Sequence, residues 1–248
     1  SKPAEKPKYP PFADVMKDAK PTADPSLIKL YEKDGKLLAD LKSSHFDKDF
    51  IVLISIAKGI GEGELLGGMS WGFGDDWVWQ FRKIEDDVHI VRRNVRFTAD
   101  KGSPEERAVS LAYTDSVLFS LPIVTTSPSG GTVVDLTSVF MSDLPQISQV
   151  LPGFGFAANK STWAAVKGFE KNVEIEVAAT YASGGTANFD TVPDSRGVTI
   201  NVHYSISLLP QNNYKPRLAD DRVGYFLTVL KDYSKQGQDD RFVRYINR

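Results

Sequence analysis

Residues 198–208 read VTINVHYSISL and have the most regular hydrophobic pattern of the chain. Apolar side chains occupy every second position from Val198 to Leu208, and polar side chains stand between them. A period of two sends successive side chains to opposite faces of a β-strand. One buried and one solvated face are typical of antiparallel sheets, so this segment predicts a long antiparallel strand.

The preceding apolar segment has the same alternation. Val173, Ile175 and Val177 alternate with two glutamates, which again predicts one buried and one solvated face. Residues 183–196 separate the two segments and are rich in Gly, Asp and Pro, which favour turns. We therefore expect two neighbouring strands joined by this loop.

A β-hairpin is predicted at residues 27–41, where two apolar segments flank the dipeptide Asp34-Gly35. Asp-Gly accepts the positive φ angles of a type I′ turn. Residues 50–56 are almost wholly apolar, which predicts a strand buried on both faces. The expected fold class is mainly β, with antiparallel sheets in a sandwich or barrel-like arrangement and a few short helices.

A second hairpin is expected around an acidic turn at Asp86 and Asp87. One face of this hairpin would carry Trp77, Trp79, Phe81, Val91, Val95 and Phe97. Three arginines follow the turn and would form cross-strand ion pairs with the acidic residues at the turn. The expected partners are Arg92, Arg93 and Arg96 on one side and Glu85, Asp86 and Asp87 on the other.

Short helices are expected at three places, and one further segment is ambiguous. The three are residues 14–19, a segment capped by Asp135 or Thr137 that ends at Met141, and a single turn capped by Ser161 that contains Trp163 and Val166. Residues 109–121 fit a helix and a strand equally well, and both alternatives stay open.

Composition limits the possible functions. The chain has 248 residues, of which 41% are apolar and 25% charged, enough for the core of an ordinary globular protein. A net charge of -2 and the lack of any long apolar stretch argue against nucleic-acid binding and membrane insertion. The absence of cysteine excludes thiol catalysis, disulfides and thiolate metal sites. Residues 1–24 are expected to form an extended Lys/Pro-rich segment and residues 25–248 one β-rich domain.

Motifs for cofactors and catalysis are missing. The Gly-rich residues 58–76 lack the spacing of a dinucleotide fingerprint or a P-loop. His45, His89 and His203 are isolated, and neither His-Glu-x-x-His nor Gly-x-Ser-x-Gly occurs. We therefore expect no cofactor, metal or catalytic residue in this chain, although 32 acidic residues leave a carboxylate pair for glycoside chemistry open.

Three tryptophans crowd one region of the sequence: Trp71, Trp77 and Trp79. Exposed rings could stack on a sugar or a peptide, while Asp75 and Asp76 could accept hydrogen bonds from hydroxyl groups. Aromatic residues at a period of two are also the normal buried face of a sheet. A glycan- or peptide-binding β module is therefore an alternative function, which depends on the exposure of these rings.

The segment 216–226 reads PRLADDRVGYF and combines charge with an adjoining apolar run at 223–230. Guanidinium groups prefer bidentate carboxylate partners when they lose water. The expectation is an ion-pair cluster close to the core, formed by Arg217, Asp220, Asp221 and Arg222.

This segment, with Asp232-Tyr233 and the closing RFVRYI at 241–246, resembles the end of the N-terminal region in a family of large bacterial zinc-dependent metalloproteases. The similarity extends back through residues 172–174, 134–137 and 12–14, and therefore covers nearly the whole chain. In that family the region has no known function, and a metzincin-like catalytic domain follows it. The specific part of the resemblance is the motif at 216–226.

The resemblance implies a non-catalytic accessory or pro-region-like domain that packs against a downstream catalytic domain. Zinc would belong only to that catalytic domain, and the location would be secreted or periplasmic. The motif residues that the resemblance singles out for structural or interdomain contacts are Arg217, Asp220, Asp221, Arg222 and Tyr225.

Overall fold

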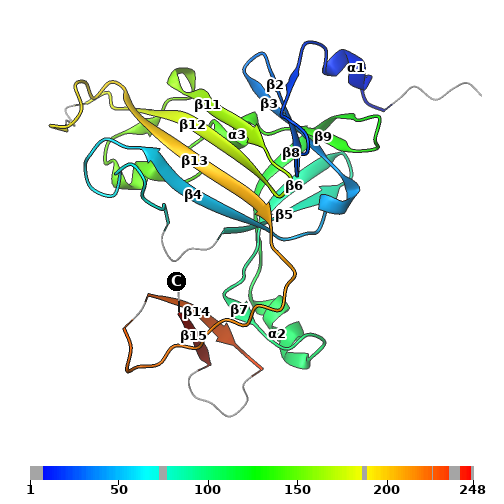
Figure 1. Cartoon of the computed structure of the whole chain (residues 1–248), viewed down its shortest axis with the longest axis vertical. Coiled ribbons are helices and arrows are strands. Elements are labelled where there is room, and N and C mark those ends of the chain that lie inside the picture. Colours follow the sequence, from blue (N-terminus) through cyan, green and yellow to red (C-terminus); the bar gives the residue numbers. More distant parts are fainter. Residues whose placement is uncertain (1–7, 73–76, 186–188, 225, 235–240, 247–248) are drawn as a thin grey trace, which may run out of the picture.

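The computed structural model describes residues 8–72, 77–185, 189–224, 226–234 and 241–246. In these residues the protein is mainly β, with a large antiparallel sheet curled into a half-barrel and a small second sheet (Figure 1). The strands of the large sheet are β1 (Lys20–Pro21), β2 (Lys29–Lys33), β3 (Lys36–Leu41), β4 (Phe50–Lys58), β5 (Trp77–Ile84), β6 (Asp87–Arg92), β8 (Ser116–Thr126), β9 (Thr132–Asp135), β10 (Gly155–Phe156), β11 (Thr162–Gly168), β12 (Asn172–Ala182) and β13 (Val198–Leu208). The small sheet consists of β7 (Phe97–Thr98), β14 (Leu227–Asp232) and β15 (Phe242–Ile246). This arrangement confirms the expected fold class.

The helices are short. They are α1 (Phe12–Val15), α2 (Pro104–Ala112), α3 (Thr137–Phe140) and 3-10 turns at Ser43–His45, Ile147–Val150 and Ala158–Lys160. In the described part of the chain, none of them has the length and apolar character needed to cross a membrane. The ambiguous residues 109–121 contain both elements, because α2 ends before β8 begins. The helical turn expected around Trp163 is wrong, since that residue belongs to β11, which pairs with β12.

The centre of the large sheet follows the alternating patterns. β12 and β13 are antiparallel neighbours, with Val177 opposite Val202, and every apolar position of β13 up to Ile206 faces the core. The β2–β3 hairpin closes through Asp34 and Gly35, whose φ angles are 48° and 77°. Both predictions are confirmed, because each depends on local chemistry.

Strand β4 lies between β13 and β5 and differs from its prediction. Phe50, Val52 and Ile54 are buried, but Leu53 on the opposite face is 56% exposed. The expectation of burial on both faces is therefore wrong. The exposure is local to β4, because on the same side of the sheet Val78 of β5 and Val91 of β6 are buried.

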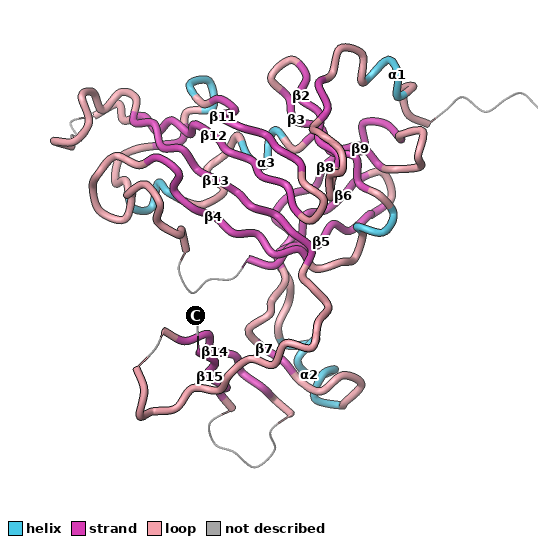
Figure 2. Tube along the Cα trace, viewed as in Figure 1, coloured by secondary structure: helices cyan, strands magenta, loops and turns pink. Residues whose placement is uncertain are grey.

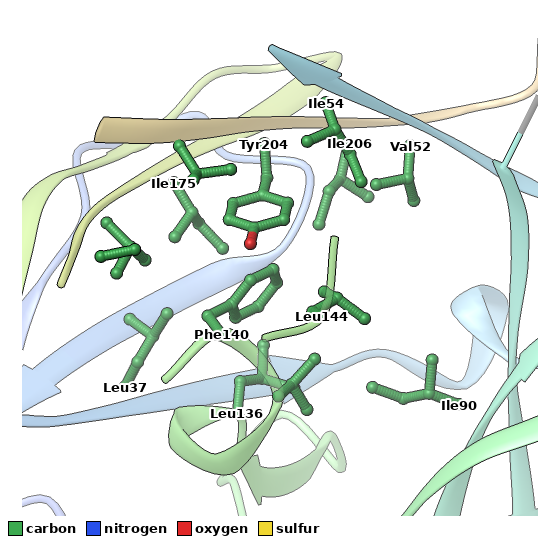
Figure 3. Packing of buried hydrophobic residues seen from close by; sticks show 14 of the residues in the cluster. Leu37, Val52, Ile54, Ile90, Leu136, Phe140, Leu144, Ile175, Tyr204 and Ile206 are labelled. Carbon is green, nitrogen blue, oxygen red and sulfur yellow. The ribbon is translucent and has the colours of Figure 1, made fainter. Parts of the chain in front are cut away.

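Residues 136–154, which we call the plug, fill the concave side of the half-barrel. Leu136, Phe140, Leu144 and Ile147 from this segment are all buried. Phe140 packs edge-on against Tyr204 of β13 with ring centroids 5.0 Å apart, and Figure 3 shows this pair at the centre of the core. The burial expected of the residues after Asp135 is thus confirmed, and the plug closes the interior of the sheet.

The two ends of the curled sheet approach each other at a seam. Leu27 donates a backbone hydrogen bond of 2.7 Å to Phe169, and the indole of Trp163 on β11 donates one of 2.7 Å to the carbonyl of Gly35. The segment that leads into β2 therefore contacts the connection after β11, and the turn of the β2–β3 hairpin contacts β11 itself.

The small sheet, α2 and their connections form a separate small lobe, which consists of residues 95–113, 216–224, 226–234 and 241–246 (Figure 2). The chain passes between the large sheet and this lobe three times: after β6, before β8 and after β13. The hairpin of β5 and β6 ends at Arg92, so the expected return through Val95 and Phe97 is wrong. Phe97 belongs instead to β7, which pairs in parallel with β14.

Candidate functional site

The described residues of the charged motif, 216–224 and 226, lie on the surface of the small lobe. Asp220 accepts hydrogen bonds from Nε of Arg222 at 2.9 Å and from Nη2 at 2.5 Å, and these bonds lower the pKa of Asp220 to about 2. Arg217 and Asp221 are exposed as well. Asp220 and Arg222 thus form a pair, but the expected position close to the core is wrong. Tyr225 lies outside the described residues.

The apolar run after this motif is exposed rather than buried. Leu227, Val229 and Phe242 are 38%, 41% and 49% exposed. Strand pairing places Leu227 opposite Ile246, Val229 opposite Arg244, and Lys231 opposite Phe242, so these side chains share one side of the small sheet. We call Leu227, Val229 and Phe242 the apolar face of the small lobe.

The small lobe has almost no core of its own. Within its described residues, Val243 is the only apolar side chain that is buried, and α2 buries none. Its internal contacts are peripheral: the rings of Phe97 and Tyr113 stack at 3.8 Å, and the hydroxyls of Tyr113 and Tyr233 are hydrogen-bonded. Since a three-stranded sheet needs a packed hydrophobic face for independent stability, this lobe is incomplete by itself.

An ion-pair network joins the lobe to the large sheet at the neck, which is our name for the two connections that follow β6 and precede β8. Arg93 lies 3.0 Å from Asp49 and 3.3 Å from Asp115, and Arg82 donates to Asp115 at 2.6 Å. Burial raises the pKa of Asp115, but the hydrogen bonds from the Asn94 amide and Arg82, with the charge of Arg93, lower it overall. The network fixes the point where the chain leaves β6 and the point where it returns to β8.

The ion pairs expected within the second hairpin are therefore wrong. Asp86 lies at the turn, where it pairs with Lys8 and accepts a hydrogen bond of 2.7 Å from Tyr9. Arg92 lies opposite Trp79, far along the hairpin from that turn. Arg93 points to the neck, where Asp49 and Asp115 are its partners.

The three tryptophans have different environments. Trp79 is 1% exposed and contacts Phe140 of the plug, so its ring is not accessible to a ligand. Trp71 and Trp77 are half-buried. Asp75 and Asp76, expected beside them, lie outside the described residues.

Trp71 and Trp77 line a pocket of about 470 Å³ at the mouth of the half-barrel. The opposite wall is the plug segment 142–146, and Arg92, Leu118 and Phe119 complete the lining from β6 and β8. The guanidinium of Arg92 lies over the Trp77 ring at 4.2 Å from its centroid. Mouths of β-barrels are frequent ligand sites, so this pocket is a candidate.

The histidines occupy three unrelated positions. His45 is buried, and burial, with a smaller effect of Lys42, lowers its pKa to about 4. His203 lies on the convex face of β13, with Nε2 2.6 Å from a carboxylate oxygen of Glu174, and His89 lies on β6. Across the described ranges, no group of three His, Asp or Glu side chains is placed to bind a metal ion.

The Gly-rich loop runs back along β4 instead of forming a phosphate cradle. Backbone hydrogen bonds of 2.9 Å connect the Met69 carbonyl to the Ile56 amide and the Trp71 amide to the Ile54 carbonyl. The loop therefore serves to position Trp71 beside the pocket.

Sequence reasoning missed the residues that make these sites. Asp49 and Asp115 stand in connections without any local pattern, and residues 142–146 meet the tryptophans only through the tertiary fold. One signal for the pocket was present in the sequence. Arg92 is a charged residue at the next position of the apolar alternation formed by Val88 and Ile90.

Comparison with known proteins gives one match. The family model of a domain of unknown function (DUF5117) matches residues 73–248. Comparisons with curated proteins and with solved structures give no match. The match begins after β4, although β4 pairs with both β13 and β5, so the folded sheet includes strands that precede the matched residues. Because the match covers well over half of the chain, this protein belongs to the DUF5117 family.

Proposed function

We propose that this chain is a non-catalytic domain of a secreted or periplasmic zinc-dependent metalloprotease, and that its small lobe packs against the catalytic domain of the same polypeptide. The observation that carries the proposal is the lobe without a core: three strands with one buried apolar side chain among the described residues and an exposed apolar face. The resemblance of the 216–226 motif to the N-terminal region of such proteases supplies the identity of the partner.

Physical arguments favour a folded partner on this face. Exposed apolar side chains gathered on one side of a sheet are typical of an interaction surface. Burial of Leu227, Val229 and Phe242 would give the sheet the packed side that it lacks. The cation Lys231 shares this side, so the complementary surface should be apolar at its centre with an acidic group at its rim.

The proposal is tested by hydrogen exchange of the 248-residue chain and of a longer polypeptide that also contains the following catalytic domain. The expected result is that amides of β14 and β15 exchange much more slowly in the longer polypeptide, while those of β12 and β13 do not change. Zinc should bind stoichiometrically to the longer polypeptide only.

Two variants make the test specific. Val229→Glu should abolish the added protection of β14 and β15, because it places a charge in the contact. Leu53→Glu is the matched control, since Leu53 is an exposed apolar residue on a strand of the large sheet, and it should leave that protection unchanged.

Equal exchange in the two polypeptides would contradict the proposal. A concentration-dependent dimer of the 248-residue chain that Val229→Glu dissociates would also contradict it, because the occupant would then be a second copy.

A further inference from the structure

We infer that the pocket between Trp71, Trp77 and the plug segment 142–146 is a saccharide-binding site. The pocket lies on the large sheet, so this inference goes beyond the proposed docking function of the small lobe.

The first argument is the position of Arg92. It continues the row of Val88 and Ile90, which are both 0% exposed and face the interior of the half-barrel. A guanidinium group at the end of such a row is unusual, because inward positions of a sheet are normally apolar. Its stacking on Trp77 at 4.2 Å orients both planar groups at the mouth.

The second argument is that Trp71 is fixed before any ligand arrives. Its indole nitrogen donates a hydrogen bond of 2.7 Å to the Pro145 carbonyl, which ties the ring to the plug. The ring itself is half-buried and lines the pocket. An aromatic surface that is already ordered saves the entropy of ordering it on binding.

The third argument is the mixture of polar and apolar groups. Asp143 accepts hydrogen bonds from Ile147 and Ser148 of the plug and from the Tyr181 hydroxyl of β12. Gln146, by contrast, is exposed at the rim and carries a side-chain amide. The Asp143 carboxylate therefore shapes the loop. The side-chain carbonyl of Gln146 accepts a hydrogen bond of 2.9 Å from Gln149, so the group that Gln146 offers to a ligand is its side-chain NH2.

These features favour a sugar over an apolar peptide side chain. A pyranose ring presents C–H groups on its faces and hydroxyls at its edge, which match indole rings and an amide respectively. A purely apolar side chain would offer no acceptor to the NH2 group of Gln146 and would remove it from water, which is costly.

The test is titration calorimetry of the 248-residue chain with cellohexaose, chitohexaose and hexagalacturonate, and with an uncharged hexapeptide of leucine and serine. At least one saccharide should bind with a Kd of about 1 mM or below. Trp77→Ala should weaken that binding by about tenfold, through loss of the aromatic contact. Trp163→Ala is the matched control, because Trp163 is half-buried on β11 outside the pocket, and it should bind normally.

Gln146→Gly provides a second variant with little risk to the fold. Gln146 has a φ of 58°, which glycine adopts without strain, and its side chain is at the surface. It should weaken saccharide binding severalfold, by the loss of one hydrogen bond.

Three outcomes would overturn the inference: no saccharide of the three binds, the hexapeptide binds more tightly than all of them, or binding survives both Trp77→Ala and Gln146→Gly. None of these outcomes bears on the docking of the small lobe, which Val229→Glu tests separately.

Discussion

Arg82 on β5 donates a hydrogen bond of 2.6 Å to Asp115, the residue at which the chain returns from the small lobe to the large sheet. Asp115 also accepts from the Asn94 amide at 2.9 Å, where the chain leaves for the lobe. The Asp115 carboxylate thus ties the outgoing and the returning segment of the neck to the large sheet.

Replacement of this carboxylate should destabilise the protein. Asp115→Asn loses charge-assisted hydrogen bonds and leaves Arg82 and Arg93 with weaker partners, so we expect the free energy of unfolding to fall by about 1–3 kcal/mol. Urea unfolding followed by circular dichroism measures the change. Asp220→Asn, in an exposed local pair, is the control and should have no measurable effect. Equal effects of the two substitutions would refute the role given to the neck.

His45 should make stability depend on pH. Its pKa is lowered from 6.5 to about 4, so the folded state disfavours the proton that the unfolded state binds. The contribution of neutral His45 to the free energy of unfolding is therefore complete above pH 6.5. It is lost as the pH falls toward 4, by at most about 3 kcal/mol.

His45→Asn retains an acceptor for the Lys42 amide without a titratable ring. Its free energy of unfolding should fall less than that of the wild type between pH 7.5 and pH 4.5. Parallel stability curves of the two proteins would show that His45 is not responsible.

Gly59 should tolerate no side chain. A Cβ at this position would lie 1.9 Å from the carbonyl oxygen of Leu65, so the loop backbone would have to move. Gly59→Ala should lower stability by about 1–3 kcal/mol, as overpacking does. Gly155→Ala is the control, because no atom lies within 4 Å of the added carbon. The measurement is the thermal unfolding of both variants. A Gly59→Ala protein as stable as the Gly155→Ala protein would contradict the prediction.

The residues matched by the family model should not fold alone. A polypeptide of residues 73–248 lacks β4, which is the neighbour of β13 and β5, and β3, which pairs with β9. We expect far-ultraviolet circular dichroism without a cooperative thermal transition, whereas residues 8–248 should unfold cooperatively. A sharp transition in the shorter polypeptide would show that the first strands are dispensable.

Local chemistry made part of the fold predictable. The alternation in β12 and β13, the Asp34-Gly35 turn and the burial of Leu136 and Phe140 all follow from residues close together in the sequence. Pairing between distant segments decided the rest. Trp163 lies on a strand because β12 is beside it, and Leu53 is exposed although Val78 and Val91 on the same side of the sheet are buried.

The candidate sites were less accessible to sequence reasoning. Trp71 and Trp77 could be singled out by composition, but the opposite wall of their pocket comes from the plug. Arg93 has partners 44 and 22 positions away, so the acidic residues nearer in the sequence, Glu85, Asp86 and Asp87, are the wrong prediction. The charged motif at 216–226 gave no sign that the apolar run beside it would remain exposed, since that depends on the missing core of the lobe.

The pairing of β4 with β13 also sets an order of events on the ribosome. Ile54 lies opposite Tyr204, so β4 emerges long before the strand that completes it. At a synthesis rate of about 5–20 residues per second, its apolar side waits on the order of ten seconds for a partner. The nascent protein should therefore depend on chaperones during translation, and spontaneous refolding of the intact chain should be slow, as expected for a topology dominated by distant contacts.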